Sequence, residues 1–212
     1  MERVYEDERQ LFRYTLCVLN WAMEPQDTYT SEAIINTNDM AYILRNTLMS
    51  CAYAADDAGN VFVVPTDFNR MELYGMAESG QEFLHAVEEH QLLAKSNEEM
   101  QLERERFIRM YSYRSNTTNV QYTPEEYRYV IPPQGLHADN RGYLWMLTGR
   151  SLSPVFQVYD YTGELQYIVN IKGMDEEDTI DVLWWRFSSN GILAFSVDPY
   201  LNPKVYYYQY PF

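Results

Sequence analysis

A short turn followed by an apolar run occurs twice in this chain, and a weaker copy occurs a third time. The copies lie at residues 56–64, 139–147 and 188–195. The first two begin with Asp56 and Asp139, and all three contain a glycine. Glycine supplies the positive φ of a tight hairpin turn without steric cost, and aspartate can accept hydrogen bonds from turn amides. The motif therefore predicts repeated β-hairpins.

The spacing of the glycines indicates that a longer unit is repeated. Gly59 and Gly80 are 21 residues apart, as are Gly142 and Gly163, and the two pairs are offset by 83 residues. Gly142 and Gly191 are 49 residues apart, close to the length of one β-propeller blade. An insertion of about 35–39 residues would explain the longer offset, because it leaves roughly one blade length.

The predicted insertion, residues 92–130, contains a helix signal. Ser96 and Glu99 form a capping box, in which each side chain can bond to the backbone amide of the other. The apolar residues that follow fall on one helical face: Met100, Phe107, Ile108 and Tyr111. We expect a helix near 96–111, and a further short helical turn at Thr123, where Pro124 could occupy the first helical position.

The remaining pattern predicts an all-β protein, namely a partial β-propeller of about three antiparallel four-stranded blades in a single domain, 1–212. The approximate blades are 28–91, 131–175 and 180–212. Alternating residues at 12–18 indicate a strand, and a turn at 36–39 between apolar runs indicates a hairpin. We expect the acidic run 175–178 to be a solvated loop.

Two consecutive phrases carry a family resemblance. Asp139-x-x-Gly142-x-Leu144-Trp145, followed by Val155-Phe156-x-Val158-Tyr159-Asp160-x-x-Gly163, resembles the six-bladed propellers of the NHL/TolB-like superfamily. The helix and the proline-rich entry to the next blade resemble a bacterial subgroup. The resemblance covers roughly residues 45–212. It implies export to the periplasm or cell envelope, although this chain contains no signal-peptide pattern.

Six blades would need roughly 250–300 residues at this repeat length. The resemblance therefore predicts that these 212 residues are the carboxy-terminal half of a longer propeller, which would need the missing blades or a partner to close.

The charge of the chain excludes some partners. The formal net charge is −15, and the 16 Lys and Arg residues are dispersed, so a phosphate-binding surface for nucleic acid is not expected. No run approaches the ~20 apolar residues of a transmembrane helix. The sequence predicts no cofactor, because it contains neither a phosphate-cradling glycine loop nor a dinucleotide fingerprint.

The candidate ligand-binding residues are His137, Trp184 and Trp185. His137 lies two residues before Asp139, and adjacent strand residues such as Trp184 and Trp185 face opposite ways, so at least one should be available to a ligand or a neighbouring sheet. An aromatic platform with Tyr143 and Tyr161 is the specific hypothesis; packing is the alternative.

No catalytic residue and no metal ligand set is predicted. The histidines lack metal-site spacing, and no Gly-x-Ser-x-Gly motif is present. Asp56, Asp57 and Asp139 are oxygen ligands that could bind Ca²⁺, but they occupy the turn position of the repeat, which already explains them. For the same reason Trp145, at the repeat position of Phe62, is predicted to be a core residue.

Three functions remain open. The favoured one is a non-enzymatic binding or scaffold module with a protein or carbohydrate ligand. The second is a propeller enzyme, a hydrolase or lyase acting on a carbohydrate or lactone, with His137 and Asp139 near its channel. The third is a structural subunit of a cell-envelope assembly.

Overall fold

The computed structural model of the protein describes residues 2–6, 9–19, 25–35, 51–115, 122–174, 183–196 and 204–210. The chain divides into two compact units. Unit 1 combines Met1–Cys51 with Leu92–Arg128, and unit 2 combines Ala52–Gln91 with Tyr129–Phe212. The predictions for residues 36–44 and 175–178 lie outside the described residues.

The described residues of unit 2 form eleven strands in three antiparallel sheets, and in each sheet the strands follow chain order. The first sheet consists of β4 (Cys51–Ala55), β5 (Val61–Pro65), β6 (Arg70–Met76) and β7 (Glu82–Glu89). The second sheet consists of β8 (Leu136–Ala138), β9 (Tyr143–Leu147), β10 (Val155–Asp160) and β11 (Leu165–Asn170). The third sheet consists of β12 (Leu183–Ser188), β13 (Gly191–Ser196) and β14 (Val205–Tyr208).

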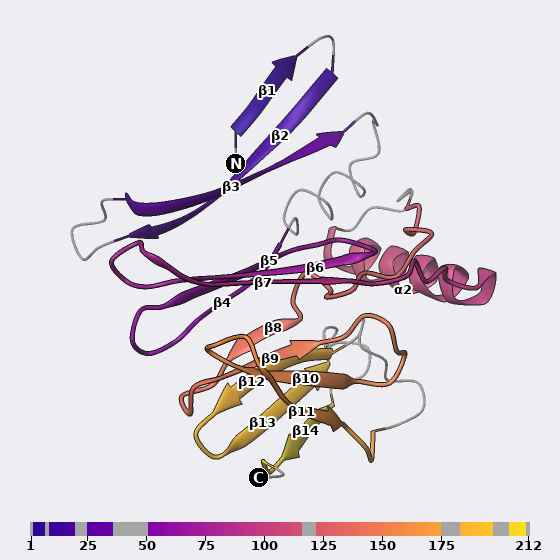
Figure 1. Cartoon of the computed structure of the whole chain (residues 1–212). Helices are drawn as coiled ribbons and strands as arrows, with labels where there is room; N and C mark the ends of the chain where they lie inside the picture. Colours follow the sequence, from indigo (N-terminus) through magenta and orange to yellow (C-terminus); the bar gives the residue numbers. More distant parts are fainter. Residues whose placement is uncertain are drawn as a thin grey trace. The chain divides into compact units, whose positions relative to one another are not determined.

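The second sheet lies between the other two, and its strand β9 is buried on both faces (Figure 1). On β9, Leu144 and Met146 pack into a core shared with the first sheet. Trp145 and Leu147 pack into a second core, shared with the third sheet. Because successive strand residues point to opposite faces, one five-residue apolar strand serves both cores.

The predicted glycine turns are confirmed. Gly59, Gly80, Gly142 and Gly163 all have φ between 80° and 87°, the left-handed region in which a Cβ is unfavourable. In the first sheet the leading turn is followed by β5, and in the second sheet it is followed by β9. Phe62 on β5 and Trp145 on β9 occupy the same position relative to their turns.

The spacing of Gly142 and Gly191 suggests that the turn between β12 and β13 matches the leading turn of the second sheet. In the structure it is one residue shorter. Ser188 pairs directly with Gly191, whereas the amide of Asp139 donates to the carbonyl of Tyr143. Gly191 therefore corresponds to Tyr143 rather than to Gly142. It follows that Leu193, not Ala194, takes the position of Trp145 in the third sheet.

The described part of unit 1 contains a three-stranded antiparallel sheet and a helix. The sheet is formed by β1 (Glu2–Glu6), β2 (Arg9–Leu19) and β3 (Pro25–Ile35), in that order. The strand expected at 12–18 lies within β2.

Helix α2 (Asn97–Ser115) confirms the prediction from the capping box and extends four residues beyond the expected end. The amide of Glu99 donates to Ser96 Oγ over 3.2 Å, and the amide of Ser96 donates to Glu99 Oε2 over 2.9 Å. Lys95 Nζ lies 2.6 Å from Glu103 Oε2, and both side chains are nearly buried.

The predicted helical turn at Thr123 is wrong. The segment is extended, and Tyr127 forms an antiparallel bridge with Ala94. The amide of Lys95 donates to Glu126, and the amide of Arg128 donates to Leu93. These two cross-strand bonds satisfy backbone groups that a helical turn would have directed along the chain.

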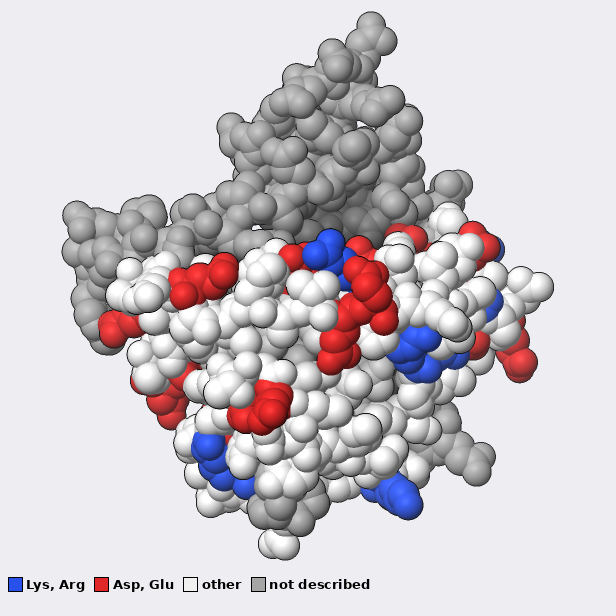
Figure 2. All heavy atoms as spheres, in the orientation of Figure 1, with Lys and Arg blue, Asp and Glu red and all other residues white. Residues whose placement is uncertain are grey.

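The described residues thus form antiparallel sheets with one helix, as the sequence predicted at that level. On the face shown in Figure 2, acidic side chains are scattered among neutral ones, and the described basic residues form no continuous surface. No helix within the described residues is both long and apolar enough to cross a membrane.

Candidate functional site

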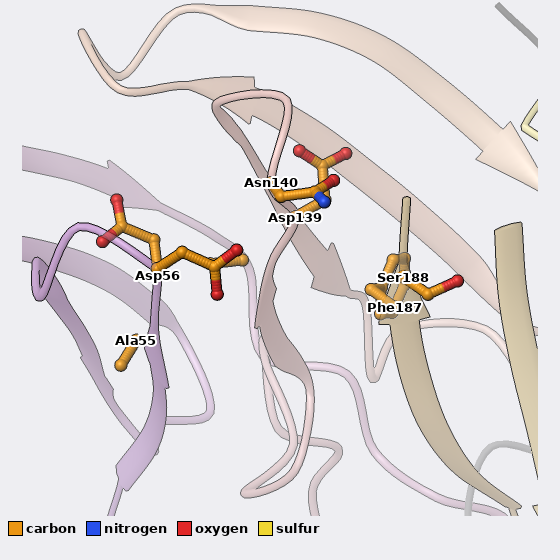
Figure 3. Close-up of a pocket in the computed structure, with 8 residues that line it drawn as sticks. Ala55, Asp56, Asp139, Asn140, Phe187 and Ser188 are labelled. Atoms are coloured by element: carbon orange, nitrogen blue, oxygen red, sulfur yellow. The ribbon is translucent and has the colours of Figure 1, made fainter. Parts of the chain in front are cut away.

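The leading turns of the three sheets of unit 2 surround one hollow, with a volume of about 250 Å³. Its lining residues come from the ends of β4, β8 and β12 (Figure 3): Ala55, Asp56, Asp57, Ala138, Asn140, Asp139, Phe187 and Ser188. The hollow therefore lies where equivalent positions of the three sheets meet. The most exposed polar side chains around it are those of Asp57, Asn140 and Ser188.

Asp139 stabilises its own turn and the core below it. Its side chain is fully buried. Oδ1 accepts from the amides of Arg141 and Tyr143, over 2.9 and 3.0 Å. Oδ2 accepts from Nη2 of Arg141 over 3.0 Å and from the indole Nε1 of Trp145 over 2.9 Å. Both carboxylate oxygens are therefore occupied by donors from the same hairpin.

Asp56 has the equivalent role in the first sheet. Its Oδ1 accepts from the amides of Ala58 and Asn60, each over 2.9 Å, and its Oδ2 accepts from the Asn60 side chain over 2.8 Å. The Tyr161 hydroxyl also bonds to this carboxylate. Burial and then the negative charge of Asp56 raise the pKa of Tyr161, so the phenol remains protonated and can donate.

Two tyrosines connect neighbouring sheets in equivalent ways. Tyr161 of the second sheet lies against Phe62 of the first, with ring centroids 4.7 Å apart. Tyr210, which follows the third sheet, lies against Trp145 of the second, at 5.5 Å. The guanidinium of Arg141 lies 3.5 Å from the centroid of the Tyr210 ring. In each case the tyrosine ring packs against the aromatic core residue, Phe62 or Trp145, of the strand that follows the turn aspartate.

The role of Tyr210 was missed in the sequence, and for Tyr161 a ligand platform and packing were both left open. A signal was present, because Tyr161 lies 22 residues after Asp139 and Tyr210 lies 22 residues after Ser188, the equivalent residue of the third sheet. The tyrosines recur with the turns, which indicates packing rather than ligand binding.

His137 lies on β8 and packs inside the interface between the second and third sheets. Its ring stacks on Phe187, with centroids 4.8 Å apart. Although part of the residue is exposed, its Nε2 is buried and has no hydrogen-bond partner among the described residues. Burial, and then the positive charge of Arg186, lower the pKa of His137 to about 3, although a hydrogen bond to the backbone of Gln134 opposes both effects. At neutral pH the ring is uncharged.

The two tryptophans of β12 face opposite ways, as their adjacency predicted. Trp185 is buried, and its ring meets Phe156 edge to face at 4.9 Å. Trp184 is on the other side of the sheet, is 36% exposed and contacts Phe195. His137, Trp184 and Trp185 therefore do not form one site, and only Trp184 is available to a ligand.

The described residues contain no group of three His, Cys, Asp or Glu side chains arranged to hold a metal ion. Two of the three aspartates at the hollow, Asp56 and Asp139, are explained by the hydrogen bonds of their turns. Comparisons of the chain with protein-family models, with curated proteins and with solved structures found no match.

Proposed function

We propose that this chain is part of a β-propeller of the NHL/TolB-like kind and works as a non-enzymatic binding or scaffold module, with its ligand held at the turn end around the hollow. The observation that supports this most strongly is the convergence of the three equivalent turns on that one hollow. Loops that a rigid scaffold brings to one place are frequent binding sites.

The stacking of the sheets supports the propeller part of the proposal. Each sheet is a meander in chain order, each packs face to face on the next, and the tyrosine contact to the preceding sheet is repeated. Successive four-stranded meanders around an axis are the pattern of propeller blades.

The environments of Asp139 and His137, the two residues that catalysis at the hollow would need, favour binding over catalysis. Both oxygens of Asp139 already accept hydrogen bonds, so this carboxylate is poorly suited to take a proton from a substrate. His137 is packed against Phe187, and its Nε2 is buried. The polar groups presented to the hollow suit hydrogen bonding to a carbohydrate or to a peptide backbone.

The second candidate is a hydrolase or lyase acting on a carbohydrate or lactone. The presence of Asp56, Asp57 and Asp139 around one hollow favours it, since glycoside chemistry uses paired carboxylates. Of the three, Asp57 is the most exposed and would have to carry the reaction.

A glycan array and a peptide display library, each probed with the purified chain, test the proposal. We expect binding that Asn140→Lys abolishes, because the new side chain fills the hollow. Ser153→Lys, an exposed change in the loop at the opposite end of β9 and β10, should leave binding intact. Binding that survives Asn140→Lys would exclude the hollow as the ligand site. Products detected by mass spectrometry that depend on Asp57 would favour the enzyme.

A further inference from the structure

The third sheet has an apolar face that points away from the second sheet. We call it the outer face. Its six residues are Trp184, Arg186, Leu193, Phe195, Val205 and Tyr207. The strand pairing places them in two rows: Trp184 opposite Phe195 opposite Val205, and Arg186 opposite Leu193 opposite Tyr207. Their neighbours in sequence, such as Trp185 and Ala194, belong to the core on the inner side.

In the first and second sheets, the face that corresponds to the outer face is covered by the next sheet. Leu193 takes the position of Trp145 in the second sheet and of Phe62 in the first. Trp145 and Phe62 are 0% exposed because the next sheet packs on them, whereas Leu193 is 38% exposed. Val205 and Tyr207 are 72% and 55% exposed on the same face. These side chains form a contiguous apolar surface that the second sheet does not cover.

The outer face is not suited to a further sheet of the same repeat. In the first two sheets, an aromatic residue packs against the tyrosine of the next sheet: Phe62 against Tyr161, and Trp145 against Tyr210. In the third sheet Leu193 stands at this position. A following tyrosine would find no aromatic ring there.

The charge of the outer face suits a second copy of the same chain. The chain has a net charge of −15, which opposes association of two copies, yet none of the six residues is acidic and Arg186 is the one charged residue among them. Against an identical face, the Arg186 guanidinium can lie over Trp184 or Tyr207 of the other copy, an attractive cation–π arrangement. β13 is the middle strand, so a two-fold axis near Leu193 brings both rows into contact.

We propose that a second copy of this chain packs on the outer face in a symmetric, face-to-face dimer. Two apolar sheet faces packed in this way form an ordinary sandwich interface, and identical patches on both subunits are the commonest oligomer geometry. The face measures roughly 15 Å in each direction, from the usual strand spacing and rise. This is less than the ~800 Å² per partner of a standard interface, so the dimer is weak.

Sedimentation velocity of the full chain from about 5 to 500 μM, a range chosen for a weak interface, tests the proposal. We expect a shift from monomer to dimer with concentration. Leu193→Glu should abolish this shift, because it places two carboxylates at the axis. Ile168→Glu makes the same change on β11, where Ile168 is 61% exposed and outside the face, and it should leave the shift unchanged. A circular-dichroism melt checks that both variants fold.

A cysteine variant distinguishes the face-to-face dimer from other arrangements. Under mild oxidation Leu193→Cys should give a covalent dimer in greater yield than Ile168→Cys or the unmodified chain, which carries Cys17 and Cys51. A chain that stays monomeric over the whole range overturns the proposal, as does a dimer that Leu193→Glu does not weaken. Neither result bears on ligand binding at the hollow, which involves different residues, whereas a dimer through the outer face would exclude the packing of a further propeller blade on the third sheet.

Discussion

The indole Nε1 of Trp145 donates a hydrogen bond to Oδ2 of Asp139 over 2.9 Å, and both side chains are buried. The largest side chain of the core is thereby joined to the turn that precedes its strand. A hydrogen bond to a charged acceptor away from water is among the stronger ones in a protein. The turn and the interface between the second and third sheets therefore stabilise each other.

Asp139→Ala should lower the free energy of unfolding by about 2–4 kcal/mol, because it leaves the indole N–H and two turn amides without their acceptor. Asp160→Ala is the matched control: Asp160 accepts from the amides of Thr162 and Glu164 in the same kind of turn, but it is more exposed. Its loss should cost clearly less than the loss of Asp139, because solvent screens the exposed carboxylate. Urea unfolding followed by circular dichroism measures both, and equal effects would show that the buried bond to Trp145 adds nothing.

Tyr210→Ala should destabilise the chain by about 2 kcal/mol, because it removes a half-buried ring that lies against Trp145 and Arg141. Tyr210→Phe retains the ring and loses the bond from its hydroxyl to the Ser188 carbonyl, at 2.6 Å. It should cost about 1 kcal/mol. Chemical denaturation separates the two contributions, and a Phe variant as unstable as the Ala variant would argue against the importance of ring stacking.

Gly142→Ala and Gly163→Ala should lower the free energy of unfolding by different amounts, although the two glycines have similar backbone conformations, with φ of 87° and 84°. A Cβ at Gly142 meets nothing within 4 Å, so only the conformational penalty of about 1–2 kcal/mol applies. A Cβ at Gly163 would lie 2.9 Å from Cδ1 of Leu84 in the first sheet, and the variant should be less stable.

Adding Leu84→Ala provides the control for the glycine pair. In the Gly163→Ala background, Leu84→Ala should lower the free energy of unfolding less than it does in the unmodified chain, because it removes the clash. In the Gly142→Ala background it should have the same effect as in the unmodified chain. A double-mutant cycle in thermal unfolding measures the coupling, and the absence of coupling at Gly163 would contradict the contact between the two sheets.

Acidification should destabilise the chain through His137. Its pKa is about 3 in the folded state, below the ordinary value of 6.5, so between these pH values the unfolded chain binds a proton that the folded chain does not. Stability contributed by the neutral ring is complete above pH 6.5 and falls by up to about 1.4 kcal/mol per pH unit as the pH drops toward 3.

His137→Phe should flatten this part of the pH profile of unfolding, since phenylalanine has no proton to gain. His85→Phe is the control, because His85 is exposed on β7, where its Nε2 lies 3.0 Å from Glu72. If the unmodified chain and His137→Phe show the same slope between pH 4 and 6.5, His137 is not the group responsible.

Local signals in the sequence correctly predicted the local structure. Gly59 and Gly142 require left-handed turns because of their sequence context, and Ser96 with Glu99 starts a helix, since in both cases the interacting groups are within a few residues. The one failure of this kind, at Thr123, has a tertiary cause: the distant residues 93–95 offered its backbone a partner.

The candidate site was less predictable. Alternation on a strand indicated that Trp184 and Trp185 face opposite sides of their sheet, but the strand alone does not say which side is covered. That depends on which side the second sheet occupies. His137 was a plausible ligand-binding residue by its position near Asp139, and only packing against Phe187 revealed a buried, neutral ring.

The sequence by itself determined the turns, the strands they connect and the repeat of Asp56 with Phe62 as Asp139 with Trp145, because backbone conformation and hydrogen bonding within a hairpin depend on nearby residues. The tertiary structure decided which faces of those strands are covered. Burial depends on residues far away in the chain, and so the burial of the Asp139 side chain and the open face around Leu193 emerge only when the three sheets are assembled.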